Sequence, residues 1–252
     1  MTDSTQGLSF ICPDWPAPAN IRALVTTRQG GVSVTPYDSF NLGLHVGDDP
    51  RHVLQNRQHL QCQLATPYEP QWLQQVHGVE VIEAKGEGGV PEADACFTSR
   101  VGLPCSVMTA DCLPVFFCSA SGDRVAVAHA GWRGLAGGVL EATVSKLQVP
   151  ATELLVWLGP AIGPQQFEVG SEVREAFLNF SADCEKDFVA QPDKSGHWLA
   201  DIYELARIRL NVLGVRQIYG GDFCTFTDAQ RFFSYRRDGV TGRMASLIWR
   251  SS

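Results

Sequence analysis

Short apolar runs recur along the chain between turn-forming residues, a pattern typical of β-strands. The run from Val125 to Ala128 is apolar at every position, which indicates a strand buried on both faces. Because such runs outnumber the helical patterns, we expect strands to dominate the fold. The expected strands cover residues 21–27, 72–77, 79–83, 93–98, 103–108, 114–118, 124–129, 154–158, 215–219 and 244–249.

A smaller number of segments show the apolar spacing of helices. The clearest one follows Asp48 and Asp49, which can cap a helix, and has Pro50 at its first position. At about 100° per residue, Arg57 lies in the middle of its apolar face. A lone buried guanidinium is costly, so Arg57 either pairs with a carboxylate or lines a ligand site. The expected helices cover residues 50–64, 134–147, 171–179 and 201–213.

Strands and helices follow one another in an irregular order, with several strands in succession between helices. This order favours an α+β, mixed α/β layered architecture over a strictly doubly wound one, with about ten strands in mixed β-sheets and roughly four packed helices. No internal repeat, low-complexity block or flexible linker interrupts the pattern. We therefore expect a single domain over residues 1–252.

Composition narrows the class of protein and partner. The net charge of −7 argues against nucleic acid, because an acidic protein repels phosphate backbones. No apolar stretch reaches the ~20 residues of a membrane span, and the N-terminal segment lacks the basic start and apolar stretch of a signal peptide. We expect a cytoplasmic protein that binds neither nucleic acid nor membrane. Its 8 cysteines include no CxxC pair, so reduced, mostly buried thiols are expected.

Three segments near the ends of predicted strands carry the residue types of a catalytic site. They contribute His77, Cys112 and His129. Two imidazoles and a thiolate suit Zn²⁺, which takes nitrogen and sulfur ligands tetrahedrally, and three protein ligands leave a fourth position for water or substrate. Strand ends are also where distant side chains converge on ligands. The residues are separated by 35 and 17 positions, so the sequence by itself does not show that they meet.

Each of these residues also has a plain structural interpretation. His77 would bond to backbone at a strand end, and Cys112 would be one more buried thiol. His129 differs, because it follows a buried strand and precedes a glycine-rich turn, where an imidazole without a role is unusual. The neighbouring Asp111 would orient a ligating histidine, transfer a proton, or form an Asx turn.

Two further segments are candidate anion sites. Gly131 and Arg133 lie in a strand-to-helix turn, whose free N–H groups and positive dipole end attract phosphate or carboxylate. Glycines for close helix packing are the alternative there. Residues 231–250 are rich in arginine and are expected to form a hairpin with mostly solvated arginines, of which Arg243 is a candidate anion contact.

Taken together, these segments resemble the YfiH family, whose members have been named both laccase-like polyphenol oxidases and purine nucleoside phosphorylases. The resemblance implies that His77, Cys112 and His129 are zinc ligands at the centre of the active site, and that Arg57 and Asn41 reach the substrate. It also implies a YfiH-like fold, which is similar to that of bacterial deamidase toxins. The matching motifs are FNLG (40–43), VGD (46–48), NR (56–57), QVHG (75–78), ADA (93–95), TADCLP (109–114), HAGWRG (129–134), GPAIG (159–163), FSYRRDG (233–239) and TGR (241–243).

The function implied by this resemblance is phosphorolysis of adenosine, inosine and methylthioadenosine to free base and ribose 1-phosphate, with adenosine deamination as a side activity. Zinc is the expected metal and copper the alternative. Phosphate would meet an anion site made from Arg57, Arg133 and the turn at Gly131. Purine nucleosides and phosphate are therefore the expected partners of a monomer or small homo-oligomer.

The sequence also bears on three other functions. A four-copper oxidase needs about ten histidines, whereas this chain has 6 and no HxH pair, so only slow copper-dependent phenol oxidation remains as a minor activity. Cys112 could instead be the nucleophile of an amide or ester hydrolase, such as a peptidoglycan-precursor editing enzyme, with His129 or His77 as base. A binding module without catalysis is the third alternative.

Overall fold

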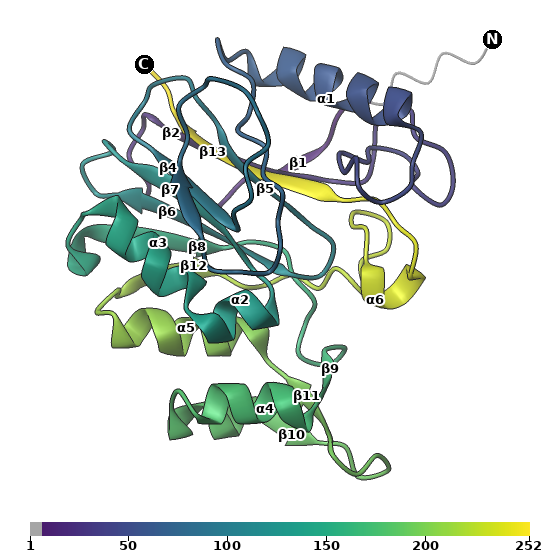
Figure 1. Cartoon of the computed structure of the whole chain (residues 1–252), viewed down its shortest axis with the longest axis vertical. Coiled ribbons are helices and arrows are strands. Elements are labelled where there is room, and N and C mark those ends of the chain that lie inside the picture. The colour runs from purple at the N-terminus through teal and green to yellow at the C-terminus, as the bar shows by residue number, and fades with distance from the viewer. Residues whose placement is uncertain (1–6) are drawn as a thin grey trace.

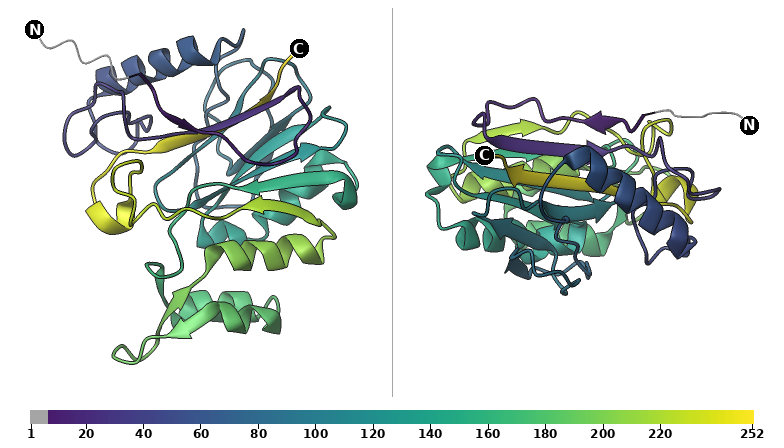
Figure 2. Two further views of the ribbon diagram at one scale, coloured as in Figure 1. Left: turned by 180° about the vertical axis from the view of Figure 1, so that it is seen from behind. Right: turned by 90° about the horizontal axis from the view of Figure 1, so that it is seen from above.

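The computed structural model describes residues 7–252, which form two large sheets stacked face to face, helices on both outer sides, and a small appended unit (Figure 1). The order of layers from α1 downward is helix, four-stranded sheet, six-stranded sheet and helices (Figures 1 and 2). This arrangement confirms the predicted α+β class with mixed sheets.

The four-stranded sheet is antiparallel throughout and has its most C-terminal strand in an inner position. β13 pairs with β2 on one side, where Leu247 faces Leu24, and with β5 on the other, where Leu247 faces Ser106. The strands in spatial order are β1 (Phe10–Ile11), β2 (Ile21–Thr26), β13 (Met244–Arg250) and β5 (Cys105–Thr109).

The six-stranded sheet is mixed, with parallel pairs only at its two edges. Its central strands are buried at every position because both faces are covered. Along β7, Val127 packs into the core between the two sheets and Ala128 into the core beneath the helices. The strands in spatial order are β12 (Gln217–Gly220), β8 (Leu154–Leu158), β6 (Leu113–Ser119), β7 (Val125–Ala130), β4 (Ala95–Thr98) and β3 (Val81–Glu83).

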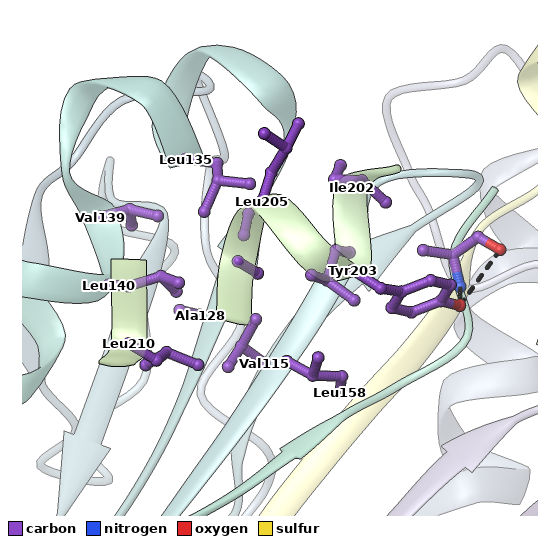
Figure 3. Close-up of a cluster of buried hydrophobic side chains, with 14 of the residues drawn as sticks. Val115, Ala128, Leu135, Val139, Leu140, Leu158, Ile202, Tyr203, Leu205 and Leu210 are labelled. Carbon is purple, nitrogen blue, oxygen red and sulfur yellow. Dashed lines mark hydrogen bonds between the residues drawn. The ribbon is translucent and has the colours of Figure 1, made fainter. Parts of the chain in front are cut away.

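Helices close both outer faces of the sandwich. α1 (Pro50–Leu64) places its buried leucines against the four-stranded sheet. On the opposite side, α2 (Trp132–Gly137), α3 (Val139–Leu147) and α5 (Ile202–Val212) cover the six-stranded sheet. Figure 3 shows the apolar side chains of this second interface, and also Tyr203, whose hydroxyl accepts a hydrogen bond from the Ala161 N–H at 2.8 Å.

The appended unit lies below the sandwich in Figure 1 and on its far side from α1. It contains a three-stranded antiparallel sheet of β10 (Phe188–Ala190), β11 (His197–Ala200) and β9 (Glu168–Gly170). The remaining short elements are α4 (Ser171–Leu178), α6 (Tyr235–Asp238) and the 3-10 helices Ala151–Glu153 and Ala182–Asp187.

Most of the predicted elements are confirmed. The helix predicted at 50–64 is α1 to the residue, because the Asp49 side chain caps it by accepting the Arg51 N–H at 2.9 Å. The helix predicted at 134–147 is instead two helices, since Gly138 adopts φ 103° and interrupts it. The strand predicted at 72–77 is wrong: within this segment only Gln74 forms an isolated bridge, to Glu92.

The C-terminal hairpin predicted over residues 231–250 is also wrong. Residues Tyr235–Asp238 form α6, and β13 pairs with distant strands rather than with the segment before it. Arg237 is not simply solvated, because its guanidinium donates to three main-chain carbonyls of the loop that precedes α6. Strands β1 and β9 to β11 were not predicted, since their apolar runs are short.

Within residues 7–252, no helix combines the length and apolarity needed to cross a bilayer. The first 6 residues, where the absence of a signal peptide was partly inferred, lie outside the described part of the chain.

Candidate metal centre

His129 stands at the end of the buried strand β7 and is 3% exposed. Its Nδ1 lies 2.8 Å from Oδ1 of Asp94, which precedes β4. The pairing of β4 with β7 fixes this contact, because the His129 N–H also donates to the Asp94 carbonyl at 2.7 Å. With Nδ1 engaged, Nε2 is the nitrogen free to bind a metal.

His77 lies in a loop, and the same Asp94 carboxylate holds this loop in place. Asp94 accepts hydrogen bonds from the main-chain N–H groups of Val76, His77 and Gly78 at 3.2, 3.0 and 2.6 Å. His77 has a positive φ of 61°, which turns the chain so that three successive N–H groups converge on one side chain. A single buried carboxylate thus positions both imidazoles.

Cys112 lies directly before β6, at the turn that follows β5. Its Sγ is 3.9 Å from Nε2 of His77. The preceding residue, Asp111, has a φ of 94°, and its carbonyl accepts the Ile162 N–H at 2.9 Å. Ile162 follows Ala161, which Tyr203 holds from α5, so the turn carrying the thiol is tied to the helical layer.

The three side chains meet with the spacing of a metal site. The ligand atoms of His77, Cys112 and His129 all lie within 4.8 Å of one another. Zinc bound tetrahedrally places nitrogen and sulfur ligands about 3.6 Å apart, close to the 3.9 Å between the His77 nitrogen and the Cys112 sulfur. A Cβ on Gly131 would lie 2.9 Å from His77 Cδ2 and 3.1 Å from Cys112 Sγ, so only glycine leaves this space open.

The charges of the cluster reinforce one another. Burial by itself would raise the pKa of the Cys112 thiol, but the imidazoles of His129 and His77 outweigh it and lower the pKa to about 6. Burial also disfavours the charged form of His129, yet the Cys112 sulfur and the Asp94 carboxylate raise its pKa to about 9. Cys112 is therefore a thiolate at neutral pH, the form that binds metals and attacks electrophiles.

Asp111 has a structural role in the described chain. Its Oδ1 accepts a hydrogen bond from the Thr225 hydroxyl at 2.6 Å, and its Oδ2 accepts the Arg236 N–H at 2.7 Å. The carboxylate that orients a candidate ligand is Asp94, which was not predicted as a site residue. The available signal was an acidic residue between two alanines at the start of a buried strand.

Arg57 and Arg243 both contact the segment 41–43. Nε and Nη2 of Arg57 donate to the Leu42 carbonyl at 3.0 and 2.8 Å, and its guanidinium lies 3.9 Å above the Trp72 ring. The Arg243 N–H donates to Oδ1 of the buried Asn41 at 2.9 Å, so Asn41 acts on Arg243 through the backbone.

Arg133 is exposed and its guanidinium lies 4.4 Å from the ring of Trp132. No hydrogen bond or ion pair among residues 7–252 ties the Arg133 side chain to the three candidate ligands. A groove of about 830 Å³ between α1 and the loop 86–90 includes Arg57 and Trp72 but none of those ligands.

Comparison with known proteins identifies the family to which this chain belongs. A family model described as multi-copper polyphenol oxidoreductase laccase matches residues 22–251. The chain belongs to this laccase-like family. A solved Neisseria meningitidis protein of the DUF152 family is 50% identical and superposes with a TM-score of 0.93 over 96% of this chain and 99% of that one.

Relatives of this laccase-like chain are named for a different reaction. It is 58% identical to a Pseudomonas aeruginosa protein named purine nucleoside phosphorylase, over 96% of this chain and 98% of the relative. It is 55% identical to the Escherichia coli purine nucleoside phosphorylase YfiH, over 95% and 98% of the two chains. A Bacillus licheniformis YfiH structure matches with a TM-score of 0.89 at 28% identity over 98% of each chain. The predicted resemblance to YfiH is confirmed.

Proposed function

We propose that this chain is a metal-dependent purine nucleoside phosphorylase acting on adenosine, inosine and methylthioadenosine. The cluster of His77, Cys112 and His129 carries the proposal, because its ligand atoms lie within 4.8 Å of one another in a chain 55 to 58% identical to relatives named for this reaction. Purine nucleosides and phosphate are then its partners, and the cytoplasm, which holds both, is its proposed compartment.

The reaction exchanges one bond at the sugar. An oxygen of hydrogen phosphate forms a bond to C1′ of the ribose, and the bond from C1′ to N9 of the purine breaks. The base leaves with the electron pair and takes up the proton of the hydrogen phosphate, which gives free base and ribose 1-phosphate. The site must therefore hold an anion beside the sugar and stabilise charge on the leaving base.

The residues of the chain supply orientation and a metal-binding set. Asp94 holds the ring of His129 and the loop of His77 in one arrangement before any ligand arrives, which lowers the cost of ordering the site. Zinc held by His77, Cys112 and His129 would supply Lewis acidity towards the substrate. Copper is the alternative occupant, since the same ligand types bind it and supply decides occupancy.

Adenosine deamination is proposed as a side activity of the same cluster. Water would add to C6 of the purine and ammonia would leave, giving inosine. The histidine, glutamate and paired-cysteine signature of known zinc nucleobase deaminases is absent from the sequence, so the ligand set would differ from theirs.

A second candidate function uses Cys112 as a nucleophile towards an amide or ester. It is favoured by the same thiolate, because a thiol with a pKa of about 6 and an imidazole nitrogen 3.9 Å away are the parts of a cysteine hydrolase. The two candidates differ in what they require. Phosphorolysis needs phosphate and a metal, whereas the hydrolase needs neither.

The test measures metal content together with release of free base from adenosine and inosine, with and without inorganic phosphate. We expect stoichiometric zinc and a phosphate-dependent release that a chelator abolishes. In the His129→Ala variant both should be lost, while in Cys12→Ser, which changes an exposed thiol, both should stay unchanged.

Two results would overturn the proposal. One is the absence of base release from zinc-loaded protein, and the other is release that continues in His129→Ala. Hydrolysis of ester substrates by metal-free protein, blocked by alkylation of Cys112, would establish the second candidate instead.

A further inference from the structure

We propose that Gln75 is a positioning residue of the candidate metal centre, because its side-chain amide sets the place of His77 relative to Cys112. This role rests on the proposed function, since it assumes that His77 and Cys112 bind one metal ion. Gln75 is half-buried and lies two residues before His77. It acts through the loop that carries His77 rather than by touching the metal.

The segment before His77 lies along the edge strand β5 in the direction of a parallel strand. Its first contact is at Gln71, which forms a parallel bridge with Cys105. The Gln71 carbonyl also accepts the Ser106 hydroxyl at 2.6 Å. Because the two chains run in the same direction, they reach the same end of β5, where one continues to His77 and the other to Cys112.

Gln75 continues this pairing with its side chain instead of its main chain. Its Oε1 accepts the Met108 N–H at 2.7 Å, and its Nε2 donates to the Met108 carbonyl at 2.8 Å. A carboxamide carries one acceptor and one donor side by side, as a peptide group does, so Gln75 pairs with Met108 as a neighbouring strand would. The two hydrogen bonds form together only at one separation of the chains, which fixes that separation close to both ligands.

A second anchor matters because Asp94 holds the His77 loop at a single point. The three N–H groups that Asp94 accepts converge on one carboxylate, which fixes where the loop lies but leaves it able to turn about that carboxylate. Asp94 directly precedes β4 of the six-stranded sheet, whereas Gln75 ties the same loop to β5 of the four-stranded sheet. With one anchor in each sheet the loop has one orientation, in which Nε2 of His77 lies 3.9 Å from Cys112 Sγ.

Closing the edge of β5 is a plain structural role that the same hydrogen bonds would also serve. Main-chain pairing closes that edge at Gln71, and it would do so equally well at Gln75. Pairing through the Gln75 side chain instead leaves the main chain free to turn, and the very next N–H group, that of Val76, already donates to Asp94 at 3.2 Å. The choice of a side chain at this position therefore favours the positioning role.

The experiment compares the zinc affinity of Gln75→Met with that of wild type, by competition with a chromophoric chelator. Methionine is of similar length but has no amide, so both hydrogen bonds to Met108 are lost. Gln74→Met is the matched control, since Gln74 is exposed and contributes its main chain to the bridge with Glu92. We expect zinc to bind about ten-fold more weakly to Gln75→Met and within two-fold of wild type to the control.

Cobalt gives a readout that a merely structural role would not move. The visible absorption of Co²⁺ bound in place of zinc depends on the number and geometry of its ligands. We expect wild type and Gln74→Met to give the same tetrahedral spectrum, and Gln75→Met to give weaker bands because His77 no longer lies at bonding distance. Gln75→Asn keeps the amide but is one methylene shorter, so it should also lose affinity and band intensity.

The outcomes separate this inference from the proposed function. A zinc affinity and a cobalt spectrum in Gln75→Met equal to those of wild type, with only a lower melting temperature, would show that the amide just closes the sheet edge. Full affinity in Gln75→Asn, or an equal loss in Gln74→Met, would also overturn the positioning role. Weaker metal binding in Gln75→Met, in a protein that releases no base, would support this role and refute the phosphorylase. If Gln75→Met does not fold, Gln75→Asn decides the question.

Discussion

Replacing Asp94 by Asn should loosen the metal centre while leaving the size of the side chain unchanged. Oδ1 of Asp94 accepts hydrogen bonds from the His77 N–H and from His129 Nδ1, and Oδ2 accepts the N–H groups of Val76 and Gly78. An asparagine amide has only one oxygen. Whichever way the amide turns, two of the four donors face an NH₂ group: either the Val76 and Gly78 N–H groups that fix the His77 loop, or the His77 N–H together with His129 Nδ1.

The expected loss of zinc affinity in Asp94→Asn follows from these contacts. Loss of a partner that orients a metal ligand typically weakens metal binding by about 10- to 100-fold, which corresponds to about 1.4 to 2.7 kcal/mol. Because two charge-assisted bonds are lost at once, we expect Asp94→Asn to fall in the upper half of this range.

The assay is competition for Zn²⁺ against a chromophoric chelator, which reports affinity without requiring activity. Asp123→Asn is the control, since Asp123 is exposed and its Oδ1 accepts the Ser119 and Ser121 hydroxyls away from the site. Zinc affinity of Asp94→Asn within two-fold of wild type would refute the argument that this carboxylate organises both histidines.

Two other predictions concern the cluster itself. Iodoacetamide should modify Cys112 in metal-free protein and spare it when zinc is bound, whereas the exposed Cys12 should react in both forms, as peptide mass spectrometry can show; equal labelling of Cys112 would argue against ligation. Gly131→Ala should weaken zinc binding at least ten-fold, because the new Cβ would lie 2.9 Å from His77 Cδ2, and Gly7→Ala, with no neighbouring atom within 4 Å, should not. Unchanged zinc affinity in Gly131→Ala would contradict this prediction, because it would mean that the His77 side chain shifts without weakening the site.

Local signals account for what could be predicted of the fold. The start of α1 is encoded locally, by the Asp49 cap and by Pro50 at the first position. The buried strand β7 is recognisable because both of its faces are covered, which removes polar residues from the run. The segment 72–77 also carries apolar residues typical of a strand, yet most of its hydrogen bonds go to Asp94 and to isolated bridges, and no local pattern reveals this.

The candidate site was only partly accessible from the sequence for the same reason. His77, Cys112 and His129 stand out by residue type, but their meeting depends on pairing between strands far apart in the chain. Asp94 is opposite His129 because Ala95 pairs with Ala128, and a shift of one residue in that register would remove the contact. Register is a property of the assembled sheet, so the sequence does not reveal that Asp94, rather than the Asp111 next to Cys112, contacts His129.

β13 lies inside the four-stranded sheet, although it is the last of that sheet's strands to be synthesised. A ribosome synthesises β2 and β5 well before β13, yet these two strands meet only through β13, which lies between them. Until then the nascent chain exposes two unpaired strand edges, each a template for wrong pairing. Chaperones that shield open edges during translation should therefore matter more for this chain than its modest size suggests.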